Sequence, residues 1–245
     1  KVDPVFKKML NDPFFEPLIL VCPYTAYGEE RMWEDMKDTY EYFEEKSYPL
    51  IPSYDKIEDR WLSLKEIKPD IVFFTNPHNL TRKEYYKDAY MNYLSYYVPY
   101  AHDISKYDNF QSQYNQYFHN CMWRIYVPHK EDLDIFKKYS MTKGENIVIT
   151  GYPCCETFIV NRQKKSNNKK TIIWAPHHTI TDDFLGYSHF LNYSELFKEI
   201  AIKYHKDIVL VFKPHPLLKP KLHKHNNWGK VKTENYYNFW TNQNN

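Results

Sequence analysis

The sequence predicts an α/β protein with parallel sheets, divided into two units. Short runs of β-branched and aromatic residues alternate with longer stretches of helical spacing, and the short runs are apolar throughout. Strands of that kind are buried on both faces, which is typical of a doubly wound parallel sheet between layers of helices. A polar, charged stretch at 162–170 (RQKKSNNKK) interrupts the alternation, so we expect it to be a linker.

The first unit, residues 1–161, is expected to be one doubly wound domain. Its first strand is expected at 18–24 (LILVCPY), followed by a helix at 29–48 in which Met32, Trp33 and Met36 recur with helical spacing. That spacing favours a core position for these three side chains over a membrane anchor. Further strands are expected at 70–76, 97–101, 123–127 and 147–150, and further helices at 83–97 and 131–139.

The second unit, residues 171–245, repeats the alternation only briefly. Strands are expected at 171–175 and 207–213, with a helix at 194–206 between them. Two strands cannot bury a sheet on both faces, because a stable sheet needs more strands or a covering layer. We therefore expect this domain to be incomplete in the sequence.

Composition excludes several classes of function. Lys and Arg number 33 against 31 Asp and Glu, a net charge of +2, which argues against a nucleic-acid-binding protein because phosphate contacts need a clear basic excess. Only five glycines are present, too few and too scattered for a glycine-rich phosphate loop. The four cysteines lack zinc-ligand spacing and are interpreted as reduced cytoplasmic thiols. No apolar run approaches the roughly 20 residues that span a bilayer.

Two loops that follow strands in the second unit carry the residues best suited to chemistry. They are 174–179 (WAPHHT) and 213–216 (KPHP). Ligands of open parallel sheets bind beyond the carboxyl ends of the strands, so both loops are expected to face one crevice. Lysine and histidine side chains there would donate hydrogen bonds to an anionic ligand such as a nucleoside diphosphate. The candidate phosphate-binding residues are His177, His178, Thr179, Lys213 and His215.

Two other roles compete for these histidines, a structural role and metal binding. A single histidine after a strand is more often structural, and two such loops make a functional role about as favoured as a structural one. A metal site is the less favoured interpretation, because the side chains of neighbours such as His177 and His178 usually diverge and no carboxylate or thiol lies at ligand spacing.

Several motifs, in this order, resemble the CDP-glycerol glycerophosphotransferase family. They are DPFFEP at 12–17, KPD to PHN at 68–79, YVPY at 97–100, GYP at 151–153, APHHT at 175–179 and KPHP at 213–216. The resemblance implies a GT-B-like architecture of two Rossmann-like domains with parallel sheets, an acceptor-side domain at 1–161 and a partial nucleotide-donor domain at 171–245. It also implies that no cofactor is needed.

The activity that the resemblance implies is transfer of glycerol phosphate from CDP-glycerol to a hydroxyl of a polysaccharide or teichoic-acid-type acceptor, with release of CMP. His215 and Lys213 would stabilise the phosphoryl oxygens or the departing CMP. His177, His178 and Thr179 would line the opposite wall of the phosphate site. His102 would take the proton of the acceptor hydroxyl.

Two alternatives stay open. A GT-B glycosyltransferase would use a UDP- or GDP-sugar, and an inactive acceptor-binding module would bind no nucleotide. The expected location is the cytoplasm or the inner face of the cell membrane, since acceptors of this family are lipid-linked. Lysines within 213–232 would contact an anionic membrane there, or else belong to a solvated loop or to the phosphate site.

Overall fold

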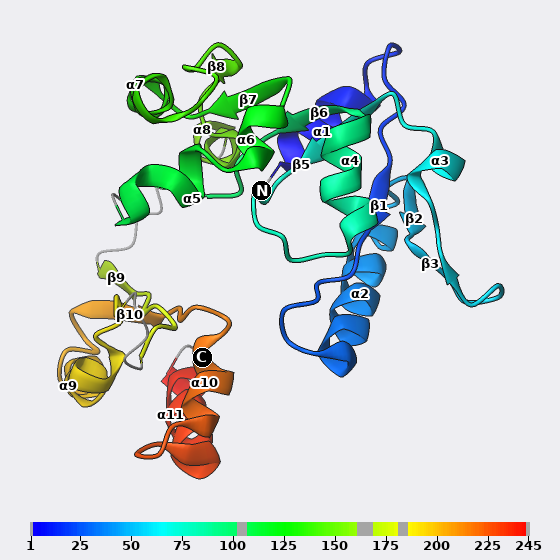
Figure 1. Ribbon diagram of the computed structural model, residues 1–245. Helices are drawn as coiled ribbons and strands as arrows, with labels where there is room; N and C mark the ends of the chain where they lie inside the picture. The colour runs from blue at the N-terminus through cyan, green and yellow to red at the C-terminus, as the bar shows by residue number, and fades with distance from the viewer. Residues whose placement is uncertain (1, 102–106, 161–168, 181–185, 244–245) are drawn as a thin grey trace. The chain divides into compact units, whose positions relative to one another are not determined.

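The computed structural model describes residues 2–101, 107–160, 169–180 and 186–243. The chain divides into two compact units, Lys1–Arg162 and Gln163–Asn245, each of which is described by itself (Figure 1). Both units mix helices with parallel strands, so the predicted α/β class is confirmed. The linker expected at 162–170 lies mostly outside the described residues.

A four-stranded parallel sheet is the centre of the first unit. Its strands are β5 (Ile71–Phe74), β6 (Leu94–Tyr97), β7 (Arg124–Val127) and β8 (Ile147–Ile149). They lie side by side in chain order, and every neighbouring pair is parallel. The double winding that we predicted needs a reversal of strand order, and this sheet contains none.

Two smaller sheets accompany it. The first expected strand is present as β1 (Ile19–Val21), which pairs in parallel with β2 (Leu50–Pro52). An antiparallel pair follows, formed by β3 (Tyr54–Asp55) and β4 (Arg60–Trp61). The prediction missed β2, β3 and β4, because two- or three-residue strands leave no readable alternation.

Helices surround these sheets, and local sequence explains several of their ends. Glu29 and Glu30 occupy the first turn of α2, where acidic side chains favour the positive end of the helix dipole. Ser63 and Glu66 form a capping box at the start of α3. The α-helices of this unit are α1 (Asp3–Leu10), α2 (Glu29–Glu44), α3 (Leu64–Ile67), α4 (Lys87–Asn92), α5 (Gln111–Tyr114), α6 (Tyr117–Cys121), α7 (Lys130–Tyr139) and α8 (Glu156–Val160), and the 3₁₀ turns are η1 (Lys83–Tyr85), η2 (Tyr107–Phe110) and η3 (Pro153–Cys155).

The helix predicted at 83–97 is wrong in its second half. The helical part ends with α4, and Tyr93 is already extended, with φ −126° and ψ 153°. Residues Leu94–Tyr97 instead form the strand β6, which lies between β5 and β7. Aromatic residues here satisfy helical spacing and a buried strand equally well, and pairing on both edges of β6 decides between the two.

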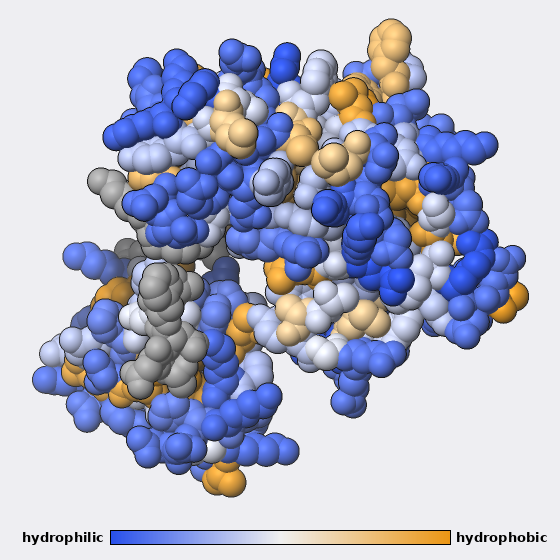
Figure 2. Space-filling model, viewed as in Figure 1, coloured by the Kyte–Doolittle hydropathy of each residue, from blue (hydrophilic) through white to orange (hydrophobic). Residues whose placement is uncertain are grey.

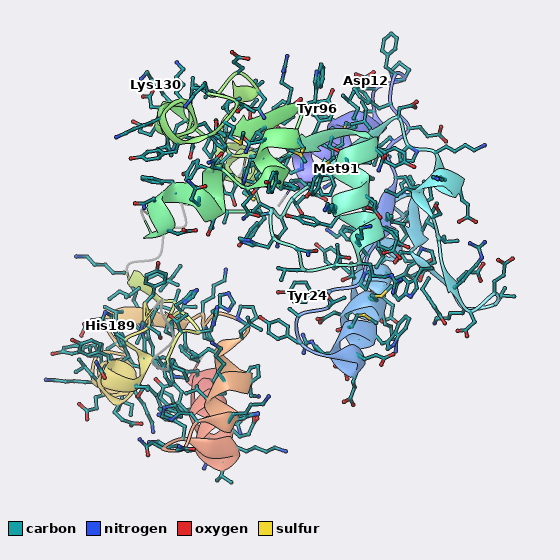
Figure 3. All side chains as sticks on the ribbon, in the orientation of Figure 1. Asp12, Tyr24, Met91, Tyr96, Lys130 and His189 are labelled. Carbon is teal, nitrogen blue, oxygen red and sulfur yellow. The ribbon has the colours of Figure 1, made fainter. Side chains whose placement is uncertain are left out.

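Aromatic side chains dominate the core of the first unit. Phe118 is 1% exposed, and its ring lies 5.1–5.7 Å from the rings of Phe74, Tyr86, Tyr90 and Tyr97. On the sheet itself, Tyr96 (Figure 3) stacks between Phe73 of β5 and Tyr126 of β7. The tyrosines at these positions are therefore packing residues.

The second unit has its own core around a two-stranded parallel sheet. Strands β9 (Lys170–Trp174) and β10 (Ile208–Phe212) pair in register, and α9 (Phe190–Lys203) connects them. Helices α10 (Leu218–Lys224) and α11 (Gly229–Gln243), which were not predicted, complete the unit. The buried residues of this core are Ile180, Phe190, Ala201, Leu210, Phe212, Leu218, Leu222, Trp228, Tyr236 and Trp240.

Strand β9 of this small sheet is largely exposed to solvent. The first four residues of β9 are exposed, and Ile173 is 62% exposed. This agrees with the expectation that two strands alone do not bury a sheet on both faces. In the view of Figure 2 most of the visible surface is hydrophilic, with scattered hydrophobic side chains. No helix within the described ranges is long and apolar enough to cross a membrane.

Replacing Phe118 by Ala should destabilise the first unit by about 3–5 kcal/mol, because it leaves a cavity among four aromatic rings. Phe14→Ala is the matched control, since Phe14 is 92% exposed and its removal should change stability by less than about 0.5 kcal/mol. Urea unfolding followed by far-UV circular dichroism measures both. Equal unfolding midpoints for the two variants would contradict the described core.

Burial raises the pKa of the Cys22 thiol to about 12. The thiolate is the reactive form, so Cys22 should be almost unreactive at pH 8. Exposed Cys155 is the internal reference. Timed iodoacetamide labelling with mass spectrometry should show Cys155 modified first and Cys22 modified only after urea is added. Early labelling of Cys22 in the folded protein would disprove this.

Candidate functional site

The pairing of β9 with β10 brings the two histidine-bearing loops together. Trp174, the last residue of β9, lies opposite Phe212, the last residue of β10. The ladder continues beyond both strands, because the Lys213 amide donates to the Trp174 carbonyl at 2.9 Å and the His215 amide donates to the Pro176 carbonyl at 3.0 Å. The loops are thus held side by side at the carboxyl edge of the sheet.

Three imidazole rings meet where these loops run together. The ring centroids of His177 and His178 are 4.2 Å apart, those of His178 and His215 are 4.4 Å apart, and those of His177 and His215 are 5.1 Å apart. All three residues are half-buried, so the cluster lies at the surface of the unit and is accessible to a ligand. The predicted convergence of the two loops is therefore present.

The expectation that His177 and His178 diverge is wrong. Their rings are tilted by 34° to each other and are in contact, although they are sequence neighbours. Side chains of neighbours separate in a regular strand, where they point to opposite faces. These two residues lie beyond the end of β9, where that alternation no longer applies.

Thr179 is buried next to the cluster and contacts His177 through its hydroxyl. Its side chain is only 3% exposed, and its hydroxyl lies 3.0 Å from Nδ1 of His177. The backbone amide of Tyr187 donates to the same hydroxyl at 3.0 Å. Thr179 was predicted to line the phosphate site directly, whereas the structure gives it contacts that orient His177.

The second loop fixes its histidine in a similar way. The Leu217 amide, just before α10, donates to Nδ1 of His215 at 3.1 Å. An imidazole that accepts a hydrogen bond at Nδ1 carries its proton on Nε2 when it is neutral. Lys213 follows β10 directly and is exposed, so its charge lies at the same edge of the sheet.

The surroundings of His177 favour the uncharged form of its imidazole. Burial, together with the nearby positive charge of Lys221, lowers the pKa of the His177 imidazole below its usual value. A neutral imidazole has one nitrogen that donates a hydrogen bond and one that accepts a proton or a metal ion. In its neutral form His177 can therefore act as a donor, a proton acceptor or a ligand.

The predicted base and the GYP motif belong to the first unit. His102 lies outside the described residues. Within the motif, Gly151 adopts a φ of +83°, which favours glycine, and the Tyr152 hydroxyl donates to the Tyr100 carbonyl at 2.8 Å. This hydrogen bond joins the GYP turn to the YVPY segment, so both motifs have a structural role.

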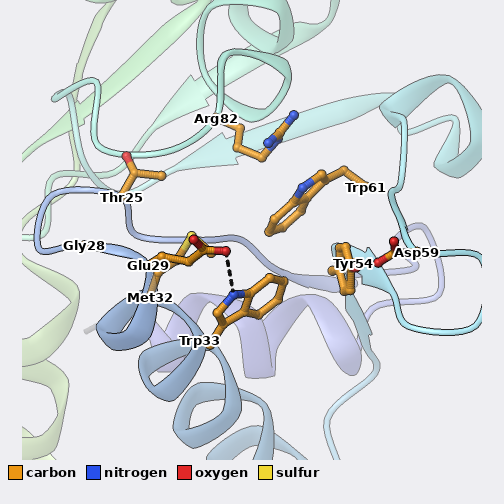
Figure 4. Close-up of a pocket in the computed structure, with 9 residues that line it drawn as sticks. All are labelled: Thr25, Gly28, Glu29, Met32, Trp33, Tyr54, Asp59, Trp61 and Arg82. Atoms are coloured by element: carbon orange, nitrogen blue, oxygen red, sulfur yellow. Dashed lines mark hydrogen bonds between the residues drawn. The ribbon is translucent and has the colours of Figure 1, made fainter.

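A pocket of about 500 Å³ in the first unit was not predicted (Figure 4). Its lining combines aromatic, acidic and basic side chains: Thr25, Gly28, Glu29, Met32, Trp33, Tyr54, Asp59, Trp61 and Arg82. One lining residue, Trp33, did stand out in the sequence. We assigned it to the core because of its helical spacing alone. The lining of the pocket includes Trp33 of α2 together with Tyr54 and Trp61 of the β3–β4 hairpin, which are far apart in sequence from the helix.

Aromatic rings form one wall of this pocket. The rings of Trp33 and Trp61 stack at 5.5 Å, and Tyr54 meets both edge-on. The Arg82 guanidinium lies 4.8 Å from the Trp61 ring, and a Glu29 carboxylate oxygen accepts from the Trp33 indole at 3.4 Å. The pocket thus offers ring edges together with hydrogen-bonding groups of both charges.

Known proteins provide no assignment for either site. No model of a known protein family matches the sequence, and no curated protein matches it.

Thr179→Val tests how the cluster is built. Valine keeps the shape but removes the hydroxyl that contacts His177 and Tyr187, so unfolding should become easier by about 1–3 kcal/mol. Thr179→Ser retains the hydroxyl and should stay within about 1 kcal/mol of the original protein. Thermal and urea unfolding measure the difference. Equal loss in both variants would show that the hydroxyl does not support the cluster.

Proposed function

We propose that this protein is a phosphoryl-transfer enzyme of GT-B-like architecture. It moves glycerol phosphate from CDP-glycerol to a hydroxyl of a polysaccharide or teichoic-acid-type acceptor and releases CMP. The observation that carries this proposal is the convergence of His177, His178 and His215 near Lys213 at the carboxyl ends of β9 and β10. Such an edge is where parallel α/β sheets bind phosphorylated ligands.

The chemistry needs charge neutralisation more than covalent catalysis. The acceptor oxygen forms a bond to the phosphorus next to glycerol, and the bond from that phosphorus to the CMP oxygen breaks. Lys213 would neutralise the negative charge on the phosphoryl oxygens and on the departing CMP. His215, with Nδ1 bonded to the Leu217 amide, would donate its Nε2 proton to one of these oxygens.

The proton of the acceptor hydroxyl must also move. His102 of the first unit remains our candidate base, since an imidazole with an ordinary pKa near 6.5 accepts protons at neutral pH. His177 and His178 would contact the phosphate from the opposite loop, and Thr179 would orient His177. In this arrangement each predicted residue keeps a role, and Thr179 acts through His177.

The pocket of the first unit is our candidate for the acceptor. Its rings present apolar surface to a sugar, and Glu29, Asp59 and Arg82 offer hydrogen bonds to hydroxyl or phosphate groups. The reaction would take place in the cytoplasm or at the inner face of the membrane, where lipid-linked acceptors are exposed. Lys219 contributes little there, because it pairs with Glu234 at 2.9 Å.

The test is release of CMP from CDP-glycerol in the presence of acceptor. His215→Ala and Lys213→Ala should each lower turnover by about 100-fold or more, because each removes a group that stabilises developing charge. His205→Ala is the matched control, since His205 lies in the same unit, outside the cluster and exposed, and turnover should be unchanged.

Three outcomes would contradict the proposal. Unchanged turnover in a folded His215→Ala variant removes His215 from the mechanism. Release of UDP or GDP from a nucleotide sugar, with CDP-glycerol inert, assigns the protein to the glycosyltransferases. Absence of any nucleotide binding in calorimetry supports an acceptor-binding module instead.

A further inference from the structure

The three clustered histidines have the composition of a metal site. Within the part of the chain that the structure describes, His177, His178 and His215 are the one group of histidine, cysteine or acidic residues close enough together to hold a metal ion. One nitrogen of each ring lies within 4.8 Å of a nitrogen of each other ring. Imidazole nitrogen is a preferred ligand of zinc, copper and nickel ions.

The spacing needs only a small adjustment to close around an ion. Nitrogen ligands of a tetrahedral zinc site lie about 3.3 Å apart, given Zn–N bonds of about 2.0–2.1 Å. Since the nitrogens now lie within 4.8 Å of one another, rotation about the side-chain bonds would have to bring them closer by up to about 1.5 Å. The backbone is itself fixed by the hydrogen bond from the His215 amide to the Pro176 carbonyl.

Hydrogen-bonding groups behind the rings hold His177 and His215 in place. A ligating histidine normally donates its other ring N–H to an oxygen, which fixes the ring and its tautomer. Nδ1 of His177 lies 3.0 Å from the buried Thr179 hydroxyl and accepts from the Thr179 amide at 3.4 Å; binding of an ion at Nε2 would move the ring proton to Nδ1, where the hydroxyl oxygen would accept it. His215 accepts the Leu217 amide at Nδ1, and coordination through Nδ1 would replace that hydrogen bond while Nε2 keeps its proton.

We propose that His177, His178 and His215 bind one divalent transition-metal ion, with Zn²⁺ as the best match. Three protein ligands leave a fourth position open, as is usual in catalytic rather than structural zinc sites. Mg²⁺ and Ca²⁺ fit poorly, because they prefer oxygen ligands. An oxygen of the donor phosphate would take the fourth position; this last point rests on the proposed function, and metal binding itself does not.

The experiment uses the untagged full chain after treatment with EDTA. Zn²⁺ is titrated in a calorimeter, and Co²⁺ is titrated with visible absorption as a reporter of coordination. We expect one ion per chain and a Co²⁺ band typical of a tetrahedral site. His177→Ala, His178→Ala and His215→Ala should each weaken binding by at least about tenfold. His205→Ala should bind as the original protein does.

Two further measurements show whether a variant that loses metal binding is still folded. Circular dichroism verifies each variant, and Zn²⁺ should raise the melting temperature of the original protein but not of the His215→Ala variant. Absence of stoichiometric binding by the original protein would overturn the proposal. So would equal binding by His205→Ala and all three cluster variants, which would indicate only surface binding.

Metal binding and the proposed function can fail separately. Stoichiometric Zn²⁺ binding by a protein that neither binds nor cleaves CDP-glycerol supports the metal site and contradicts the proposed function. Cleavage of CDP-glycerol by protein that binds no Zn²⁺ or Co²⁺ supports the function and overturns the metal site.

Discussion

The parallel pairing of β9 with β10 is the constraint on which the candidate site depends. Its register places Trp174 opposite Phe212, and two further backbone hydrogen bonds carry the alignment from the strands into the loops. The same pair anchors the aromatic core, since the ring centroids of Trp174 and Phe212 are 5.2 Å apart. A one-residue slip would reverse the faces of one strand relative to the other and change how the histidines meet. The pairing of β9 with β10 therefore determines both the packing of the core and the geometry of the site.

Partial burial decides which histidines are available for chemistry. His119 is 1% exposed and packed among aromatic rings, and burial lowers its pKa to about 3, so it is a structural residue. The clustered histidines are only half-buried, and their rings contact one another at the end of a sheet. Polar groups near a surface can exchange water for a ligand at modest cost, whereas a buried imidazole without access cannot.

Local composition was enough to predict most of the strands. Features that depend on contacts between distant segments of the chain were missed. Uniformly apolar runs identified the strands that became β1, β5, β7, β8, β9 and β10, and loop positions after strands identified His177 and His215. Local spacing misassigned Leu94–Tyr97, because strand pairing outweighed helical spacing there. It also could not indicate that His177 and His178 converge, or that the β3–β4 hairpin completes an aromatic pocket against α2.

The most direct test of this account is a nuclear Overhauser measurement between histidine rings of the isotopically labelled protein in solution. Such cross-peaks require protons closer than about 5 Å, and the rings of His178 and His215 are in contact across the two loops, 4.4 Å between centroids. The account predicts a cross-peak between these two rings that disappears in a His178→Ala variant. Assigned ring signals with no cross-peak between the loops would contradict it, because the candidate site would then not be assembled.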